Sequence, residues 1–209
     1  MSEISLEIKK DRLAQRLPQR ASTDADYPFC LRVNLHGVPL VFHLTSEKLF
    51  ELLTNHFPED WRHRTAGAKK PLKVFWHDPR QDGLWDDADA DCRLRSDAHG
   101  EFAWQRDFVA ADCGDRIYLA CREEIDDGFF NFLRWLMPRK MLTLNRLLLH
   151  SSCVVDGRGR AYLCLGESGA GKTTIAGLAC GRPVLGDDMN VLLLENGLFK
   201  VTPDRKSVV

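Results

Sequence analysis

The segment from residue 166 to residue 174 carries the residue types that bind phosphate groups. It matches the pattern G-x-x-x-x-G-K-[ST] and reads Gly166-Glu167-Ser168-Gly169-Ala170-Gly171-Lys172-Thr173-Thr174. Glycines let a backbone adopt left-handed angles, so that successive N–H groups can point toward one anion. The start of the following helix adds positive potential at the same place. We expect Lys172 to contact phosphate oxygens and the Thr173 hydroxyl to bind a Mg²⁺ ion held between them. The motif therefore predicts a phosphate-binding loop rather than a Gly-rich turn that binds nothing.

Two further groups that could do chemistry flank this loop in the sequence. Asp187 and Asp188 follow Lys172 by 15 and 16 positions, after only one short helix, so their carboxylates are expected to fold back beside the loop. His150 lies 16 positions before Gly166. A carboxylate beside bound phosphates can accept the proton of an acceptor hydroxyl. From the residues alone, the acidic pair can also be a simple turn, and His150 a hydrogen-bonded core histidine.

The elements expected to position these groups alternate between strands and short helices. Apolar runs at 147–155 and 161–165, separated by a glycine-containing turn, predict an antiparallel hairpin that leads directly into the loop. A short helix that ends at Gly181 and a strand that begins near residue 184 should follow it. Upstream, the sequence predicts a hairpin over 31–44, a helix over 46–57, strands over 102–109 and 116–121, and an aromatic-rich helix over 129–137 that Pro138 kinks or stops.

These elements indicate an α/β protein with two domains. We expect a mixed-sheet P-loop nucleotide-binding domain over residues 138–209, preceded by a smaller α+β domain over residues 1–137, whose sequence shows no chemical motif.

The order of histidine, phosphate loop and acidic pair has a counterpart in a known family. The run from Leu149-His150-Ser151-Ser152 through the loop to Leu185-Gly186-Asp187-Asp188 resembles the catalytic domain of HPr kinase/phosphorylase. It is also similar to the nucleotide-binding part of ATP-dependent phosphoenolpyruvate carboxykinase, which shares that fold. The resemblance covers about 50 of the 209 residues.

The resemblance implies a role for each matched residue. Asp187 corresponds to the general base that acts on the serine hydroxyl of a protein substrate, and Asp188 to a position near the divalent metal. His150 corresponds to a histidine that orients or polarises these acids. The implied cofactors are ATP and Mg²⁺, and the implied partner is a small protein or peptide that accepts the phosphoryl group. In the kinase family the domain continues beyond the acidic pair, whereas this chain extends 21 residues past Asp188. We therefore expect a C-terminally truncated kinase domain or one that a partner completes.

Composition excludes several other classes. The chain has 29 Lys and Arg against 30 Asp and Glu, a net charge of −1, which argues against a general nucleic-acid binder. The longest apolar stretch, residues 133–149, is interrupted by charges and a proline, which argues against a membrane-spanning segment. The seven cysteines form no Cys-x-x-Cys pair, and the N-terminus does not resemble a secretory signal, so we expect reduced thiols and a cytoplasmic location.

The sequence thus favours an ATP-dependent kinase that phosphorylates a serine hydroxyl, with a homo-oligomer as a possible assembly. Two alternatives stay open: a nucleotide-binding regulatory module without turnover, and a carboxykinase-like reaction on a small molecule.

Overall fold

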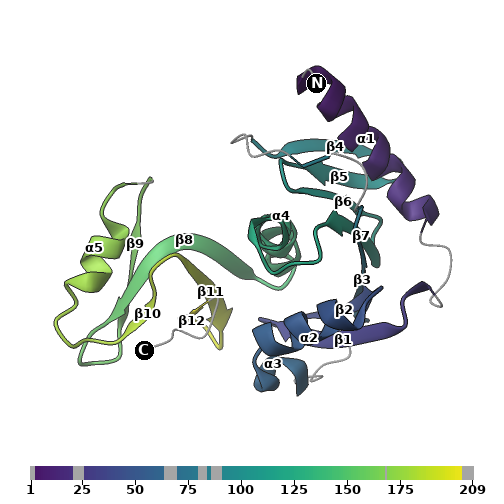
Figure 1. Cartoon of the computed structure of the whole chain (residues 1–209). Helices are drawn as coiled ribbons and strands as arrows, with labels where there is room; N and C mark the ends of the chain where they lie inside the picture. The colour runs from purple at the N-terminus through teal and green to yellow at the C-terminus, as the bar shows by residue number, and fades with distance from the viewer. Residues whose placement is uncertain are drawn as a thin grey trace. The chain divides into compact units, whose positions relative to one another are not determined.

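The computed structural model describes residues 3–20, 26–63, 70–79, 84–85, 91–167 and 169–203. The chain divides into two compact units, Met1–Leu136 (unit 1) and Met137–Val209 (unit 2). The boundary lies inside one helix and next to the expected division at residue 137. Each unit has its own sheet, as Figure 1 shows.

Unit 1 is built on a seven-stranded sheet with the order β1-β2-β3-β7-β6-β5-β4. The β2–β3 and β3–β7 pairs are parallel and the other pairs are antiparallel, so this sheet is mixed. The strands are β1 (Phe29–Leu35), β2 (Val38–Leu44), β3 (Leu72–His77), β4 (Arg93–Asp97), β5 (Gly100–Trp104), β6 (Phe108–Asp112) and β7 (Arg116–Cys121). The helices are α1 (Glu3–Arg20), α2 (Glu47–His56), α3 (Glu59–His63) and α4 (Asp127–Leu142).

Helices cover both faces of the unit 1 sheet. On one face, α1 packs Leu13 and Leu17 into a buried cluster with Phe75 and its neighbours. On the other face, the ring of Phe129 from α4 stacks on Trp76 with centroids 5.0 Å apart and an interplanar angle of 8°. Adjacent residues of a strand point to opposite faces, which explains how Phe75 and Trp76 reach separate clusters.

Unit 2 contains an antiparallel sheet with one helix beside it. The strand β8 (Arg146–Val155) is central, because β9, β10 and β11 all pair with it, and β12 extends the sheet from β11. The other strands are β9 (Ala161–Leu165), β10 (Val184–Gly186), β11 (Met189–Glu195) and β12 (Leu198–Pro203), and the helix is α5 (Lys172–Gly177), which packs on β8 and β9.

The structure confirms the general α/β class and corrects three of our expectations. Unit 1 is larger than unit 2 rather than smaller. The mixed sheet belongs to unit 1, whereas every described strand pair of unit 2 is antiparallel. Of the two effects expected of Pro138, the stop is wrong, because α4 continues through the proline to Leu142. The proline removes one backbone hydrogen bond, and the buried aromatic face of α4 evidently outweighs this local cost.

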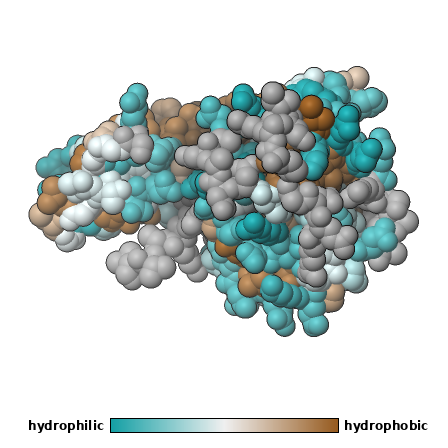
Figure 2. Space-filling model, turned by 45° about the horizontal axis from the view of Figure 1, so that its top comes forward, coloured by the Kyte–Doolittle hydropathy of each residue, from teal (hydrophilic) through white to brown (hydrophobic). Residues whose placement is uncertain are grey.

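The surface of unit 2 is rich in exposed apolar side chains. Among the described residues, two large hydrophobic side chains exposed to solvent belong to unit 1, Ile8 and Leu94. Nine belong to unit 2: Leu142, Leu147, Tyr162, Leu165, Ile175, Leu178, Leu194, Leu198 and Phe199. Figure 2 shows hydrophobic surface over this unit, on its left side. Within the described part of the chain, no helix has both the length and the hydropathy needed to cross a bilayer.

Candidate functional site

Three glycines of the loop between β9 and α5 are required by its backbone or its packing. Gly169 and Gly171 adopt φ angles of +80° and +86°, the left-handed region that side-chain-bearing residues avoid. Gly166 is required for a different reason, since a Cβ atom there would lie 2.8 Å from the Cβ of Ala170. Ser168 lies outside the described residues. The two left-handed glycines alternate with Ala170, which is the kind of backbone that turns successive N–H groups toward one anion.

The start of α5 leaves further backbone donors without a side-chain cap. Gly171 occupies the N-cap position, and the first helical hydrogen bond runs from the Ile175 N–H to the Gly171 carbonyl. The N–H groups of the first turn therefore have no intrahelical acceptor. Because α5 has only six residues, its dipole is small, and the local N–H groups are the main source of positive potential.

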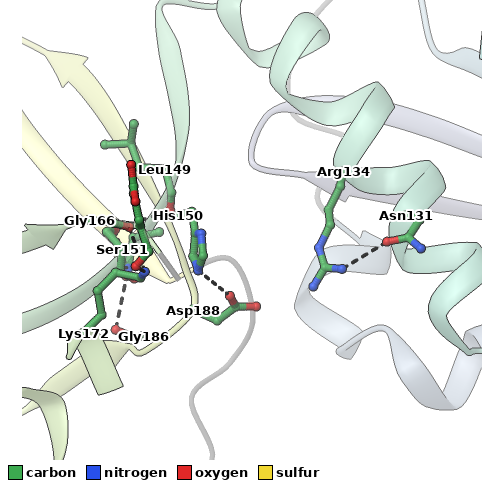
Figure 3. A network of polar contacts seen from close by, with 11 residues as sticks. Asn131, Arg134, Leu149, His150, Ser151, Gly166, Lys172, Gly186 and Asp188 are labelled. Carbon is green, nitrogen blue, oxygen red and sulfur yellow. Dashed lines mark hydrogen bonds and ion pairs between the residues drawn. The ribbon is translucent and has the colours of Figure 1, made fainter. Parts of the chain in front are cut away.

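Lys172 is buried beneath the loop, at 8% exposure. It lies one helical turn before the buried Ala176, so its stem faces the sheet. Its Nζ donates to the carbonyl oxygens of Gly166, at 2.8 Å, and Glu167, at 2.9 Å (Figure 3). An ammonium group carries three N–H donors, so Lys172 retains capacity to donate to a phosphate oxygen. The side chain thus holds the loop closed and places positive charge inside it.

The acidic pair lies at an interruption of the strand that pairs with β8. Both β10 and β11 run antiparallel to β8, and the register shifts between Val184 and Gly186, where β10 bulges. The chain then passes through Asp187 and Asp188 before Met189 pairs with His150. The backbone carbonyl of Asp188 accepts a hydrogen bond from the Ser151 N–H at 2.9 Å. Both aspartates are exposed, so their carboxylates are accessible to a ligand.

Sheet register brings the loop and the acidic pair to the same level. Ser151 of β8 pairs with Leu165, the last residue of β9, and its N–H bonds to Asp188 on the opposite side. Leu165, Ser151 and Asp188 therefore lie in one row across three neighbouring strands. With strands about 4.8 Å apart, the backbone where the loop begins and that of Asp188 are separated by about 10 Å. Ser151 of β8 fills the space between them within the sheet, so a ligand that contacts both the loop and Asp188 would have to lie over this edge of the sheet.

His150 precedes Ser151 on β8, opposite Met189, and its side chain contacts the second acid of the pair. Its Nε2 lies 3.4 Å from Oδ1 of Asp188, and more than half of each side chain is exposed (Figure 3). This position is incompatible with a core histidine. The acidic pair connects β10 to β11. Its backbone is fixed to β8 by the hydrogen bond from the Ser151 N–H to the Asp188 carbonyl. His150, Lys172 and Asp188 are thus brought to one region of unit 2, and Asp187 is adjacent to them in the chain.

The remaining loop residues have simpler positions. Thr173 and Thr174 are exposed on the first turn of α5, where the Thr173 hydroxyl is accessible to a metal ion. The backbone carbonyl of Glu167 accepts from the Ala170 N–H as well as from Lys172. Beneath the site, burial raises the pKa of the Cys153 thiol, with a further contribution from Cys164, so Cys153 stays protonated and uncharged.

Two residues that the sequence interpretation did not single out support the acidic pair. Asn190 is fully buried and its Nδ2 donates to the backbone oxygen of Ser151 at 2.7 Å. Gly186 lies against it, because a Cβ at Gly186 would meet Asn190 Oδ1 at 2.8 Å. A signal was present, since Asn190 is the one polar residue in the otherwise apolar run 189–194.

Unit 1 contains a separate cavity of about 570 Å³ that shares no residue with the loop. It is lined by Trp85, Arg106, Asp107, Arg122, Ile125, Asp126, Asp127 and Phe130. Arg106 is engaged there by Asp107 and Asp127, at 3.4 Å and 3.1 Å, so much of its charge is compensated internally.

Comparison of the sequence with protein-family models and with curated proteins finds no match in either set. Among the described residues, no group of three or more His, Cys, Asp or Glu side chains could hold a metal ion. Magnesium in phosphoryl-transfer sites usually takes only one or two protein oxygens and fills its remaining positions with phosphate and water oxygens. Thr173 and Asp188 provide such hard oxygen ligands.

Proposed function

We propose that unit 2 binds Mg²⁺·ATP in the loop 166–174 and transfers the γ-phosphoryl group to a hydroxyl of a protein or peptide acceptor. The resemblance to HPr kinase/phosphorylase suggests a serine as the acceptor. The observation that carries the proposal is the row in which Leu165, Ser151 and Asp188 stand on neighbouring strands, with the buried Lys172 under the loop. Phosphoryl transfer depends mainly on positioning and charge stabilisation. In this proposal the row would position the acidic pair, and Lys172 would stabilise the phosphate charge.

The residues present fit a nucleoside triphosphate and its metal ion. Left-handed backbone at Gly169 and Gly171 supports a cradle of N–H donors, and Lys172 adds a fixed positive charge. The Thr173 hydroxyl and the Asp188 carboxylate would hold Mg²⁺, which neutralises phosphate charge when bound.

In this proposal, the acidic pair and the histidine manage the acceptor proton. Asp187 would accept the proton of the acceptor hydroxyl, because an exposed carboxylate beside the loop can contact an incoming hydroxyl. His150 would orient Asp188 through the contact between Nε2 and Oδ1. The roles are separable, since Lys172 acts on the nucleotide, whereas Asp187 acts on the acceptor.

The test combines nucleotide binding with transfer to serine-containing peptides. Lys172→Met is expected to lower ATP affinity at least tenfold, whereas Asp187→Asn should keep ATP affinity and lose most transfer of labelled phosphate. Lys200→Met and Glu195→Gln are matched controls, because these residues pair with each other on β11 and β12 outside the loop. Equal transfer by the wild type and Asp187→Asn would remove Asp187 as the base. Equal ATP binding by Lys172→Met and the wild type would remove the loop as the nucleotide site.

A nucleotide-binding module without turnover is a second candidate. The nine exposed apolar side chains of unit 2 favour it, because apolar surface left open to solvent can serve as an interaction site. For this candidate, ATP should raise the melting temperature of unit 2, and the addition of peptides or other hydroxyl acceptors should produce no ADP. Acceptor-dependent ADP release would exclude it.

A further inference from the structure

Asn190 is a buried amide in a strand of apolar residues, directly after the acidic pair. Its side chain is fully buried, and Met189 and Val191 flank it on β11. Burying an amide costs free energy unless its polar atoms find partners, so its hydrogen bonds show what it stabilises.

The Asn190 amide links both ends of the acidic segment to β8. Three acceptors lie within hydrogen-bonding distance of Nδ2: the carbonyl of Ser151 at 2.7 Å, Ser151 Oγ at 3.2 Å and the carbonyl of Gly186 at 3.4 Å. The amide has two hydrogens, so two of these acceptors share one of them. Gly186 immediately precedes the acidic pair, and Ser151 immediately follows His150 in β8. Asp187 and Asp188 therefore lie within a short chain segment closed by one side chain.

The same residues are tied together by the backbone. The Ser151 N–H donates to the Asp188 carbonyl, so Ser151 contacts both Asp188 and Asn190. Gly186 leaves the space that the amide occupies, since a Cβ there would lie 2.8 Å from Asn190 Oδ1 and 3.0 Å from the Met189 carbonyl. Within the described residues, Asn190 Oδ1 has no hydrogen-bond partner. The amide is therefore connected to its surroundings through the hydrogen bonds of Nδ2 alone.

We infer that Asn190 is a positioning residue that holds Asp187 and Asp188 at the level of the phosphate loop. This inference rests on the proposed function, because it assigns Asn190 to the support of the metal-binding and proton-accepting carboxylates. Asn190 contacts neither nucleotide nor acceptor and acts through the Gly186–Ser151 connection. Partners that orient metal ligands from behind typically contribute 10- to 100-fold to metal affinity.

The test measures metal binding rather than turnover, so it needs no identified acceptor. Mn²⁺ replaces Mg²⁺ and is titrated into the full chain with ATP kept below the protein concentration, so that little unbound ATP competes for the metal, and free Mn²⁺ is followed by electron paramagnetic resonance. Asn190→Leu keeps the approximate volume and removes the amide, and is expected to weaken Mn²⁺ binding about tenfold. The affinity for metal-free ATP should stay within twofold, because the loop glycines and Lys172 are unchanged.

Val191→Ala is the matched control, since Val191 is equally buried on the same strand but carries no polar atom. Both variants should melt at lower temperature than the wild type, and only Asn190→Leu should lose Mn²⁺ affinity. In an Asp188→Asn background, Asn190→Leu should cause no additional loss, because the carboxylate that it positions is already gone.

The outcomes separate this inference from the proposed function. Mn²⁺·ATP binding by the wild type together with unchanged affinity in Asn190→Leu would overturn the positioning role and leave the proposed function intact. An equal loss in Val191→Ala, or a full additional loss in the Asp188→Asn background, would assign Asn190 to folding alone and also overturn it. If the wild type binds no Mn²⁺·ATP, both the proposed function and this inference fail.

Discussion

The backbone angle at Gly171 offers a test that separates loop geometry from the stability of unit 2. Gly171 has φ +86°, and a Cβ built there would meet nothing within 4 Å. Gly181, past the end of α5, has φ +77° and equally open surroundings. Replacing either glycine with alanine imposes nearly the same backbone strain, without a steric clash. Only Gly171, however, belongs to the loop 166–174 that we propose binds phosphate.

The magnitude of the strain follows from the angle alone. An alanine in the left-handed region costs about 1–2 kcal/mol. Its smaller set of unfolded conformations offsets about 0.4–1 kcal/mol of that cost. Both variants should therefore lose about 1 kcal/mol of stability. In Gly171→Ala the loop can relieve strain by rotating φ, which turns an N–H away from the phosphate. Losing one hydrogen bond to a charged group costs about 1.5–3 kcal/mol, or a 10- to 100-fold lower ATP affinity.

The assay must report on unit 2 specifically. All five tryptophans lie before Met137, so their fluorescence follows unit 1. Hydrogen exchange of peptides covering residues 161–182 follows the loop and α5 instead, because the exchange rate reports the free energy of local opening. Titration with a fluorescent ATP analogue gives the affinity of each variant.

We expect similar increases in exchange for both variants and a large affinity loss for Gly171→Ala only. Wild-type ATP affinity in Gly171→Ala would show that the left-handed backbone is not used for phosphate binding. The same affinity loss in Gly181→Ala would show that the effect is general destabilisation. Either result would refute the reasoning from loop geometry.

Three further predictions address the rest of the chain. Phe129→Ala should lower the stability of unit 1 by about 3–5 kcal/mol in urea unfolding followed by tryptophan fluorescence, because the ring is fully buried and stacks on Trp76; a loss below 1 kcal/mol would contradict the packing described. Hydrogen bonds from the Arg160 backbone and side chain lower the pKa of Asp156 to about 2 in the folded state. The ionised Asp156 therefore stabilises unit 2 at pH values above its unfolded pKa near 4, and this stabilisation is lost as the pH falls through about 2. Asp156→Asn should be less stable than the wild type at pH 7 but not at pH 2. Hydrogen exchange of unit 2 at the two pH values checks this. Phe199→Ser should leave hydrogen exchange in unit 2 unchanged, because the ring is 74% exposed, and should reduce any concentration-dependent association seen in analytical ultracentrifugation; unchanged association would exclude this ring from the contact.

Local patterns predicted the elements that need only short-range information. The hairpin of β8 and β9 and its direct entry into the loop follow from alternating apolar runs around a glycine turn, and the structure confirms them. The helix expected over 46–57 is confirmed as α2, with Ser46 accepting the Leu49 N–H as its N-cap. The expected strand over 102–109 is wrong in extent, because a turn after Trp104 divides it into β5 and β6. Pattern alone did not show this turn, since apolar residues continue on both sides.

Features that depend on tertiary contacts were beyond the sequence interpretation. The parallel pairing of β3 with β2 and β7 joins segments far apart in the chain, and no local signal specifies it. A stop was one of the two effects expected of Pro138, and it is wrong because α4, whose Phe129 packs on Trp76, continues beyond the proline. The spacing suggested that the acidic pair returns toward the loop. The bulge in β10 and the hydrogen bond from Asn190 to Ser151 could not be predicted from the sequence, because both depend on how the strands pair.

The two halves of the candidate site are positioned by different physical means. The level of Asp188 relative to His150 is set by the β8–β11 register, which pairs Met189 with His150 and continues to Leu193 with Arg146. A slip of one residue would turn the buried Val191 toward the opposite face, so the apolar pattern of β11 resists it. The loop 166–174, in contrast, depends on glycine angles and on Lys172, with no strand pairing to enforce it. The acid–histidine arrangement should therefore exist without nucleotide, while the loop is the part that ligand binding can adjust. This difference is why Gly171→Ala is expected to lower ATP affinity with the metal site intact, and Asn190→Leu to lower metal affinity with ATP binding intact.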